Sequence, residues 1–151
     1  MVKQKEIPVE QPVGRILSNL GRSFLQTLNR DLYHLDIDRN FYALLLIENA
    51  EGNITQQELA NLLDTDKASI VRIVDYLSDH LYIKRVQNAK DRRKYSLVLT
   101  AKARKETPKI KSAIKEIISS AFKGVSTTDK KKFYYILEQL KNNLNAYNKG
   151  I

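Results

Sequence analysis

Cysteine is absent from this chain of 151 residues. Its absence excludes disulfide bonds, thiolate metal sites and thiol-based sensing of oxidants. A long hydrophobic run is missing too: no apolar stretch approaches the roughly 18 residues of a membrane-spanning helix, and no charged-then-apolar leader is visible. We therefore expect a cytoplasmic protein that has no membrane partner.

The sequence signatures of an enzyme are missing as well. The five glycines form no phosphate-binding loop and no nucleophile elbow, and there is no Cys-His pair or patterned pair of acids. The two histidines, His34 and His80, lie far apart and lack the repeated spacing of a metal site. We predict no catalytic residue, no metal site and no cofactor.

Positive charge is abundant, and it is concentrated in one segment. The formal net charge is +9, and residues 84–105 hold nine Lys or Arg against one acid, Asp91. Such a patch favours a polyanionic partner, either nucleic acid or an anionic membrane surface. Membrane-surface binding needs a basic amphipathic helix with bulky apolar residues opposite. Here the charge centres on a predicted hairpin loop instead, which favours nucleic acid.

The first third of the chain is predicted to contain two helices. Residues 1–11 show no periodicity and are interpreted as a flexible arm. Over residues 12–35, apolar side chains recur at steps of three and four, which predicts a long amphipathic helix. A second helix is expected over about residues 39–50, and Gly52 frees the chain to turn after it.

The middle of the chain changes to shorter elements. Thr55 and Glu58 have the spacing of a capping box, so a short helix should begin there and run through Leu63. After a polar turn, a further helix is predicted from about residue 67 to Leu81, with one apolar face.

A hairpin follows these two short helices. Residues 82–86 and 95–99 have the composition of strands, and the basic run 90–94 forms the loop between them. This is the layout of a winged helix-turn-helix. In that motif the second helix enters the major groove of DNA, and here the basic hairpin loop, the wing, suits the minor groove beside it.

The last third is helical again. Two apolar stripes, at residues 110–125 and 133–144, are broad enough for burial against other helices. Pro108 should kink or interrupt the first of these helices near residues 104–107, because proline lacks the N–H for the preceding turn. Residues 148–151 are expected to be a frayed tail.

Three features together resemble the MarR family of bacterial winged helix-turn-helix transcriptional regulators. They are the order of the helices, the segment from Asp66 to Asp75, and the wing Asp91-Arg92-Arg93 that leads to Leu97-Val98-Leu99-Thr100. The resemblance covers roughly residues 12–147. A single Asp-Arg-Arg would mean little, and the spacing from helix to wing to Leu-x-Leu-Thr is the most specific part.

The resemblance implies a fold and a mode of action. The fold is mainly α with a small antiparallel β-hairpin: a winged helix DNA-binding domain over residues 36–103, and N- and C-terminal dimerisation helices over 12–35 and 104–147. Members of the family form homodimers that bind a pseudo-palindromic operator, most often as repressors. Many release DNA when a small, often aromatic effector binds between the two parts.

Two positions depart from the family pattern. Leu81 stands between the predicted recognition helix and the wing, and Ala103 stands shortly after the Leu-x-Leu-Thr, where the family usually has glycines. If the first position needs a left-handed backbone, leucine is strained there and the helix end should rearrange.

Roles in DNA binding can be assigned to two groups of side chains. The N-terminal half of a recognition helix meets base edges, and Arg72 can form a bidentate contact to guanine. The alternative for Arg72 is a phosphate contact or a solvated position. Arginines of the wing suit a narrow minor groove, with Arg93 favoured by the resemblance, and the alternative is a solvated hairpin tip. The candidate residues are Lys67, Ala68, Ser69 and Arg72 on the helix, and Lys90, Arg92, Arg93 and Lys94 on the wing.

Two acids and one helix start complete the predicted interface. Asp75 and Asp91 would repel phosphates, so we expect them to pair with Arg72, Arg85 or Arg93 and orient those side chains. Thr55 and Gln56 begin the first helix of the motif and are candidate phosphate contacts, because a helix N-terminus attracts anions. A purely structural cap is the alternative.

The outer helices are predicted to form a dimer interface. The default interpretation of their apolar stripes is an intramolecular core, but they offer more apolar surface than a small winged domain can cover. The candidate residues are Leu17, Leu20, Ile117, Phe133, Leu137, Leu140 and Leu144.

These observations favour a sequence-specific transcriptional regulator that binds double-stranded DNA as a homodimer. Its alternatives are a sequence-tolerant architectural DNA-binding protein and a winged helix used for protein contact, because the same charge pattern serves them. A small aromatic effector of unknown identity is a further expected partner. Phe24, Tyr33, Phe41 and Tyr42 are candidates to line its pocket, with core packing as the alternative.

Overall fold

The computed structural model describes residues 12–37 and 39–150. The predicted flexible arm, residues 1–11, and the final residue of the predicted tail lie outside the described residues. The rest of that tail is not frayed at residue 148, because the last helix continues through Lys149.

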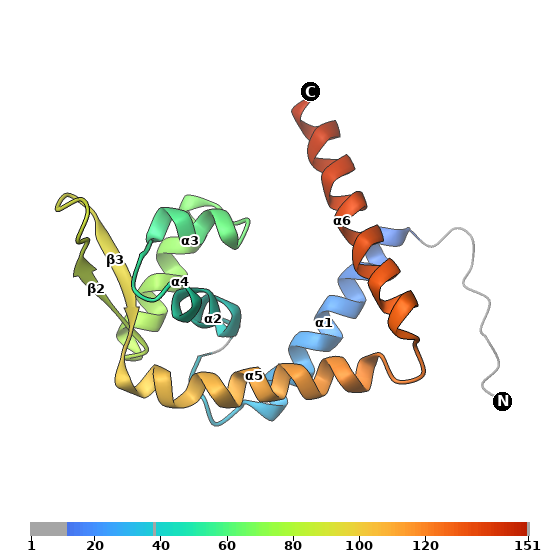
Figure 1. The fold of residues 1–151 in the computed structure, drawn as a ribbon, viewed down its shortest axis with the longest axis horizontal. Coiled ribbons are helices and arrows are strands. Elements are labelled where there is room, and N and C mark those ends of the chain that lie inside the picture. Colours follow the sequence, from blue (N-terminus) through green and yellow to red (C-terminus); the bar gives the residue numbers. More distant parts are fainter. Residues whose placement is uncertain (1–11, 38, 151) are drawn as a thin grey trace. The chain divides into compact units, whose positions relative to one another are not determined.

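The described part of the chain contains six helices and three short strands (Figure 1). The predicted mainly α fold with a winged helix-turn-helix is confirmed. In chain order the elements are α1 (Val13–Asp31), α2 (Phe41–Asn49), β1 (Ile54–Thr55), α3 (Gln56–Leu62), α4 (Lys67–Asp79), β2 (Ile83–Gln87), β3 (Tyr95–Leu99), α5 (Ala101–Ala121) and α6 (Thr127–Lys149).

The chain divides into two compact units, residues 1–115 and 116–151. We call them the N-terminal unit and the C-terminal unit. The boundary falls inside α5, so this division differs from the predicted functional boundary at residues 103 and 104. The assignment of the outer helices to dimerisation stays a prediction.

The hydrophobic core of the N-terminal unit gathers the apolar faces of its short helices. Leu44 of α2, Leu59 of α3, and Val74 and Leu77 of α4 are fully buried, as is Ile110 of α5. Burial of such a side chain stabilises the fold by roughly 1.5–3 kcal/mol. Helix α4 is therefore fixed by a shared core with α2, α3 and α5.

The sheet has three antiparallel strands in the order β1-β3-β2, rather than the two of a simple hairpin. In the β2–β3 pair, Ile83 lies opposite Leu99 and Gln87 lies opposite Tyr95. The added strand is β1, whose Ile54 pairs with Leu97. A strand of two residues is too short to show alternation in the sequence, so it was not predicted.

Two helices differ from their expected course. Helix α1 ends at Asp31, and Leu32 and Leu35 lie in the following turns, buried against the core. Helix α5 passes through Pro108 without the predicted interruption. The Thr107 hydroxyl lies 3.5 Å from the Arg104 carbonyl, which would otherwise accept the missing N–H, and donates a 2.7 Å hydrogen bond to Glu48 of α2.

The C-terminal unit contains the end of α5 and all of α6. Ser126 caps α6 by accepting the backbone N–H of Asp129 at 3.0 Å. Phe122 packs edge-on against Phe133, with ring centroids 5.6 Å apart, and Lys130 lies over the Phe122 ring. No residue of α6 is fully buried, so its apolar stripe is only partly covered in the single chain.

Candidate nucleic-acid interface

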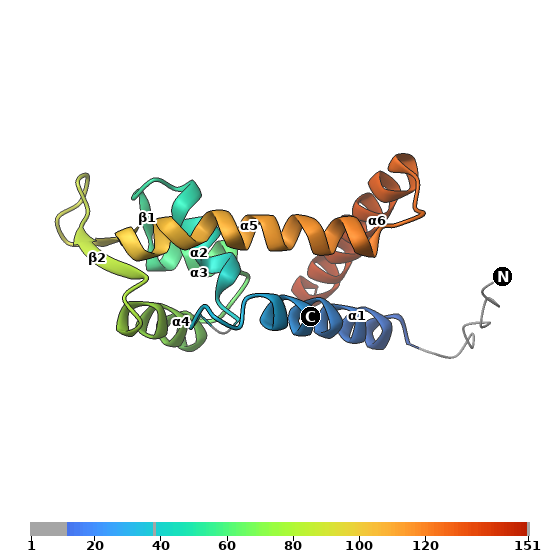
Figure 2. The same cartoon turned by 90° about the horizontal axis from the view of Figure 1, so that it is seen from below.

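Helix α4, the predicted recognition helix, lies at the same end of the N-terminal unit as the β2–β3 hairpin (Figures 1 and 2). Asp66 caps the helix, and its Oδ1 accepts the backbone N–H groups of Ala68 and Ser69 at 2.9 and 2.8 Å. These hydrogen bonds lower the pKa of the Asp66 carboxyl, and the one from the Ser69 N–H has the largest effect. The cap fixes where the helix begins and which residues form its first turn.

The four predicted base readers do not have equal access to solvent. Lys67, Ala68 and Arg72 are exposed on α4, as residues that reach a groove must be. Ser69 is half-buried, and its hydroxyl donates to Asp66 Oδ2 at 2.8 Å. Ser69 must therefore give up a cap hydrogen bond, or share it, in order to reach a base.

Helix α3 begins with the predicted capping box. The Thr55 N–H donates to Glu58 Oε2 at 2.7 Å, and Thr55 Oγ1 accepts the Glu58 N–H at 3.3 Å. The Thr55 N–H also lowers the pKa of the Glu58 carboxyl. Thr55 and Gln56 are half-buried. The structural role of the Thr55 cap is confirmed, whereas a phosphate contact by either residue stays a prediction.

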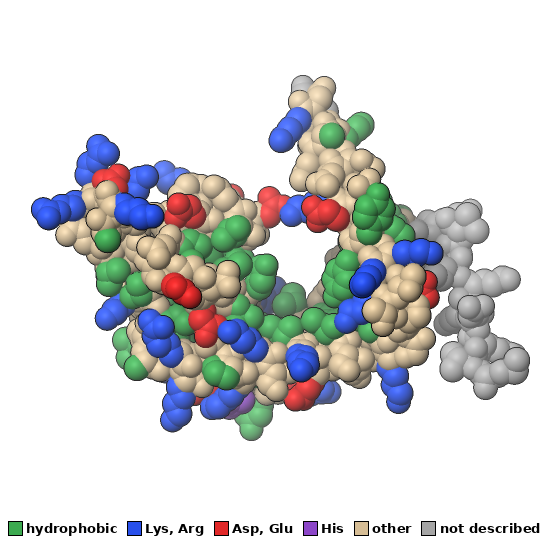
Figure 3. Space-filling model, in the orientation of Figure 1, with side chains coloured by type: hydrophobic (Ala, Val, Ile, Leu, Met, Phe, Trp, Pro, Cys, Tyr) green, Lys and Arg blue, Asp and Glu red, His purple; other side chains and the backbone are tan. Residues whose placement is uncertain are grey.

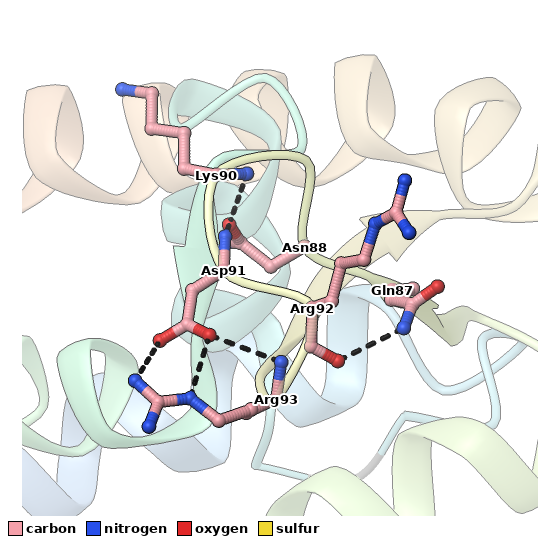
Figure 4. A network of polar contacts seen from close by, with 6 residues as sticks. All are labelled: Gln87, Asn88, Lys90, Asp91, Arg92 and Arg93. Atoms are coloured by element: carbon pink, nitrogen blue, oxygen red, sulfur yellow. Dashed lines mark hydrogen bonds and ion pairs between the residues drawn. The ribbon is translucent and has the colours of Figure 1, made fainter.

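The tip of the wing, the loop from Asn88 to Lys94, is held by the Asn88 side chain (Figure 4). Asn88 Oδ1 accepts the backbone N–H groups of Lys90 and Asp91 at 2.9 and 3.0 Å. Its Nδ2 donates to Ser96 Oγ at 2.8 Å, which ties the loop to β3. Asn88 thus closes an Asx turn and anchors it to the sheet.

Hydrogen bonds within the wing also hold its two arginines, Arg92 and Arg93. Asp91 Oδ1 accepts both the backbone N–H of Arg93 at 3.0 Å and its Nε at 3.2 Å, and the Arg93 side chain lowers the pKa of Asp91. The Arg93 side chain remains 91% exposed. Gln87 Nε2 donates to the Arg92 carbonyl at 2.9 Å, which fixes the backbone beneath Arg92 (Figure 4).

The other predicted orienting acid also has its expected type of partner. Asp75 of α4 accepts a 2.6 Å hydrogen bond from Arg85 Nη2 of β2. This ion pair links the recognition helix to the wing strand. The pairing of both acids with arginine is confirmed, and its effect on DNA binding stays a prediction.

The connection from α4 to β2 turns at Leu81, which has a φ of 61°. The Tyr82 N–H donates to Leu77 O at 2.9 Å and the Leu81 N–H donates to Ser78 O at 3.0 Å, the two hydrogen bonds of a Schellman motif. The Leu81 carbonyl then accepts the Thr100 hydroxyl at 2.6 Å. The predicted rearrangement of the helix end is wrong: leucine adopts the left-handed conformation in place of the family glycine. The other departure, Ala103, is buried in the core.

Positive charge gathers at the tip of the wing. In the space-filling view, Lys and Arg side chains cluster around the tip of the hairpin (Figure 3). Lys90, Arg92, Arg93 and Lys94 are all exposed there. A projecting loop with this charge attracts phosphates at long range.

Asn88, Gln87 and Ser96 were not predicted as part of the interface. All three side chains are uncharged, whereas the prediction of the interface rested on positive charge. The signal that could have found Asn88 is its place two residues before Lys90 in a hairpin loop, because asparagine side chains accept hydrogen bonds from backbone N–H groups two residues further on.

The predicted dimerisation residues are incompletely covered in the single chain. Each lies on α1, α5 or α6. Leu17, Ile117, Phe133 and Leu137 are half-buried, whereas Leu20, Leu140 and Leu144 are exposed.

Some of the aromatic residues predicted to line an effector pocket line two cavities in the N-terminal unit. Tyr33 and Phe41 line a cavity of about 460 Å³, and Tyr42 lines another of about 310 Å³. Phe24 lines neither of these two cavities.

The described residues contain neither a candidate metal cluster nor a candidate membrane-spanning helix. Among residues 12–37 and 39–150 there is no group of three or more His, Asp or Glu side chains that could hold a metal ion. In the same ranges no helix is both long and apolar enough to cross a membrane.

Comparisons with known proteins agree with the geometry. The sequence model of the MarR family matches residues 38–94, which include α2, α3, α4, β2 and the wing tip. The structure resembles a crystal structure described as MarR, with 26% identity and a TM-score of 0.76 over 96% of this chain and 99% of that one. A MarR transcriptional regulator from Methanosarcina mazei Go1 is also 26% identical, with a TM-score of 0.76 over 89% of this chain and 97% of that one. A mutant MarR from E. coli, crystallised with operator DNA, shares the fold, with 24% identity and a TM-score of 0.76 over 85% of this chain and 93% of that one.

Proposed function

Because this chain belongs to the MarR family of transcriptional regulators, we propose that it represses transcription by binding a pseudo-palindromic operator as a homodimer. It acts in the cytoplasm, where a bacterial chromosome lies. Members of the family are regulators rather than enzymes, so the prediction of a non-enzymatic protein is confirmed.

One observation carries the proposal: a preorganised basic wing lies at the same end of the unit as the exposed start of α4. Arg93 is solvent-exposed but held by Asp91, and the wing strand is tied to α4 by the Asp75–Arg85 pair. Ordering these groups before binding reduces the conformational entropy that binding must overcome. The arrangement suits a helix in the major groove and an arginine in the adjacent minor groove.

Homodimer formation is supported by the incompletely covered apolar surface of the outer helices. Leu140 is 37% exposed and Leu144 is 61% exposed on α6, where no residue is buried. Burial of such side chains against a second copy follows from the hydrophobic effect. A twofold dimer then presents two recognition helices to the two halves of an inverted repeat.

We further propose that a small-molecule effector releases the DNA. A ligand can shift the population of binding-competent dimers only if it binds one arrangement of the recognition helices better than the other. The cavity lined by Tyr33 and Phe41 supports this proposal, because it also contains Tyr76 of α4. A molecule bound there would contact the recognition helix directly.

Alanine substitutions at Arg72 and Arg93 test the assignment of roles. The duplex for the assay is enriched from a random pool, and affinity is measured by fluorescence anisotropy over a range of salt concentrations. Arg93→Ala should weaken binding to many sequences and reduce the salt slope by about one, whereas Arg72→Ala should cost about 1–3 kcal/mol and relax discrimination at one base position.

Lys132→Ala provides the matched control, because it removes one positive charge from the exposed surface of α6. It should change neither the sequence preference nor the contacts of the wing. An equal loss of affinity on every duplex for both arginine variants would contradict base reading by Arg72. It would favour sequence-tolerant binding instead.

A further inference from the structure

The cavity beside α4 has an unusual chemical lining for so basic a protein. It lies where the end of α1, the following turns, the start of α2 and α4 meet, and it has a volume of about 460 Å³. Three aromatic rings line it, those of Tyr33, Phe41 and Tyr76, and Asp36 contributes the charged side chain of the lining. No Lys or Arg contributes to that lining, although the chain carries 26 of them.

This combination matches one class of ligand. The faces of aromatic rings carry partial negative charge and attract cations, and a carboxylate adds a full negative charge at the same place. An anionic ligand would meet Asp36 with no Lys or Arg in the lining to compensate its charge. We propose that this cavity binds an organic cation with an aromatic or alkyl body.

Asp36 is at the same time the point where this cavity is tied to the recognition helix. Its Oδ1 accepts the Tyr76 hydroxyl at 3.2 Å, and its Oδ2 lies 3.2 Å from His80 Nε2. The rings of Tyr76 and His80 stack with their centroids 4.0 Å apart, and His80 Nδ1 lies 2.8 Å from the Tyr76 carbonyl oxygen. One carboxylate thus holds two neighbouring side chains at the C-terminal end of α4.

A cation that pairs with Asp36 competes with both of these contacts. The Asp36 side chain is 74% exposed, so exchanging its partners involves little desolvation. Release of Tyr76 and His80 removes a tie between α4 and the turns after α1. This inference rests on the proposed function, because the consequence is a changed position of the recognition helix and a lower affinity for DNA.

The second cavity lacks this property. Glu48 and Lys111 both line it, and their charged atoms form an ion pair of 2.6 Å. Opposite charges that satisfy each other leave no net preference for a charged ligand. The cavity at Asp36 is therefore the site with a defined charge selectivity.

Binding is tested first without DNA. Benzyltrimethylammonium, benzyl alcohol and benzoate share a benzyl or phenyl body and carry a positive charge, no charge and a negative charge. Each is titrated into the full chain and followed by NMR of the backbone amides. We expect saturable shifts around Tyr33, Asp36 and Tyr76 with the cation, and weaker binding of the other two.

Three variants locate the site and its chemistry. Asp36→Asn removes the charge but keeps an acceptor oxygen, and it should weaken cation binding by about two- to five-fold. Tyr33→Leu should also weaken it, and this side chain is 84% exposed, so the substitution leaves the core intact. Asp31→Asn, which removes a charge from the end of α1 outside the cavity lining, should leave the affinity unchanged.

Equal binding of benzoate, or unchanged cation affinity in Asp36→Asn, would overturn the site. A separate measurement adds the cation to a preformed complex with an enriched duplex. Release of DNA from the wild type but not from Asp36→Asn supports the coupling, and saturation of the cavity without loss of DNA affinity contradicts it. If the protein binds the cation but no DNA, the proposed function is wrong and the proposed ligand site is still supported.

Discussion

The left-handed backbone at Leu81 leads to a prediction about stability. This residue has a φ of 61° at the C′ position of the Schellman motif that ends α4. Leucine in the left-handed region places its Cβ too close to the carbonyl oxygen that follows. We expect Leu81→Gly to increase the free energy of unfolding.

The magnitude follows from two opposing effects. Removing the strain gains roughly 1–2 kcal/mol, and the greater freedom of glycine in the unfolded chain costs roughly 0.5–1 kcal/mol. The Leu81 side chain is 68% exposed, so little apolar burial is lost. The net gain is about 0–1.5 kcal/mol, with a midpoint of ~0.75 kcal/mol, and the whole range corresponds to a rise of roughly 0–6 °C in Tm for a chain of this size.

Urea unfolding followed by circular dichroism measures this gain. Leu81→Ala is the control for loss of the side chain, since alanine keeps the strain. Asp64→Gly is a second control: it alters the same motif at the end of α3, where φ is 52°, but aspartate tolerates this conformation better than leucine and the gain should be smaller. Leu81→Gly that is no more stable than Leu81→Ala would refute the reasoning.

Three further predictions concern the wing, the α2–α5 contact and the dimer. Asn88→Ala removes three hydrogen bonds of the wing, and it should lower affinity for the enriched duplex about five-fold with little change in Tm; a wild-type affinity in an anisotropy titration would contradict the positioning role. The hydrogen bond from the Lys111 ammonium lowers the pKa of the Glu48 carboxyl below its usual 4.5. The ionised Glu48 therefore stabilises the fold above pH 4.5, and this stabilisation is lost as the pH falls through the lower pKa of the folded state. Glu48→Gln should therefore be less stable than the wild type at neutral pH in urea titrations, with the difference closing in acid; a difference that does not change with pH would count against the ion pair. Charged substitutions at Leu140 and Leu144 should give monomers that bind operator poorly, and an unchanged dimer mass in sedimentation would refute this interface.

Features encoded by neighbouring residues could be predicted from the sequence. Thr55 and Glu58 lie three residues apart and satisfy each other's backbone N–H groups, so the start of α3 needs no tertiary information. The composition of residues 95–99, in which Tyr95, Leu97 and Leu99 alternate with Ser96 and Val98, likewise located β3 at its observed bounds. Local hydrogen bonding and strand periodicity are sufficient for such elements.

Features that depend on distant partners were missed. Tyr76 is half-buried, and its hydroxyl donates a hydrogen bond to Asp36, which lies forty positions earlier in the chain. The cavity at Asp36 and the stacking of Tyr76 on His80 follow from that contact. The continuity of α5 through Pro108 similarly depends on the packing of Thr107 against Glu48 of another helix.

Leu81 combines both kinds of information. The family pattern indicated that this position needs a left-handed backbone, which the structure confirms. The sequence alone did not show that Leu81 would adopt this left-handed conformation in spite of its strain. The Thr100 hydroxyl bonds the Leu81 carbonyl at 2.6 Å and helps to hold this conformation.

The central claim is that a dimer reads an inverted repeat with α4 and the wing. Selection of bound sequences from a random duplex pool tests it most directly, with the enriched and scrambled duplexes then compared at two salt concentrations. We expect an inverted repeat whose half-sites are about one helical turn apart, bound far more tightly than the scrambled duplex. Uniform, steeply salt-sensitive binding to every duplex would contradict it and favour an architectural role.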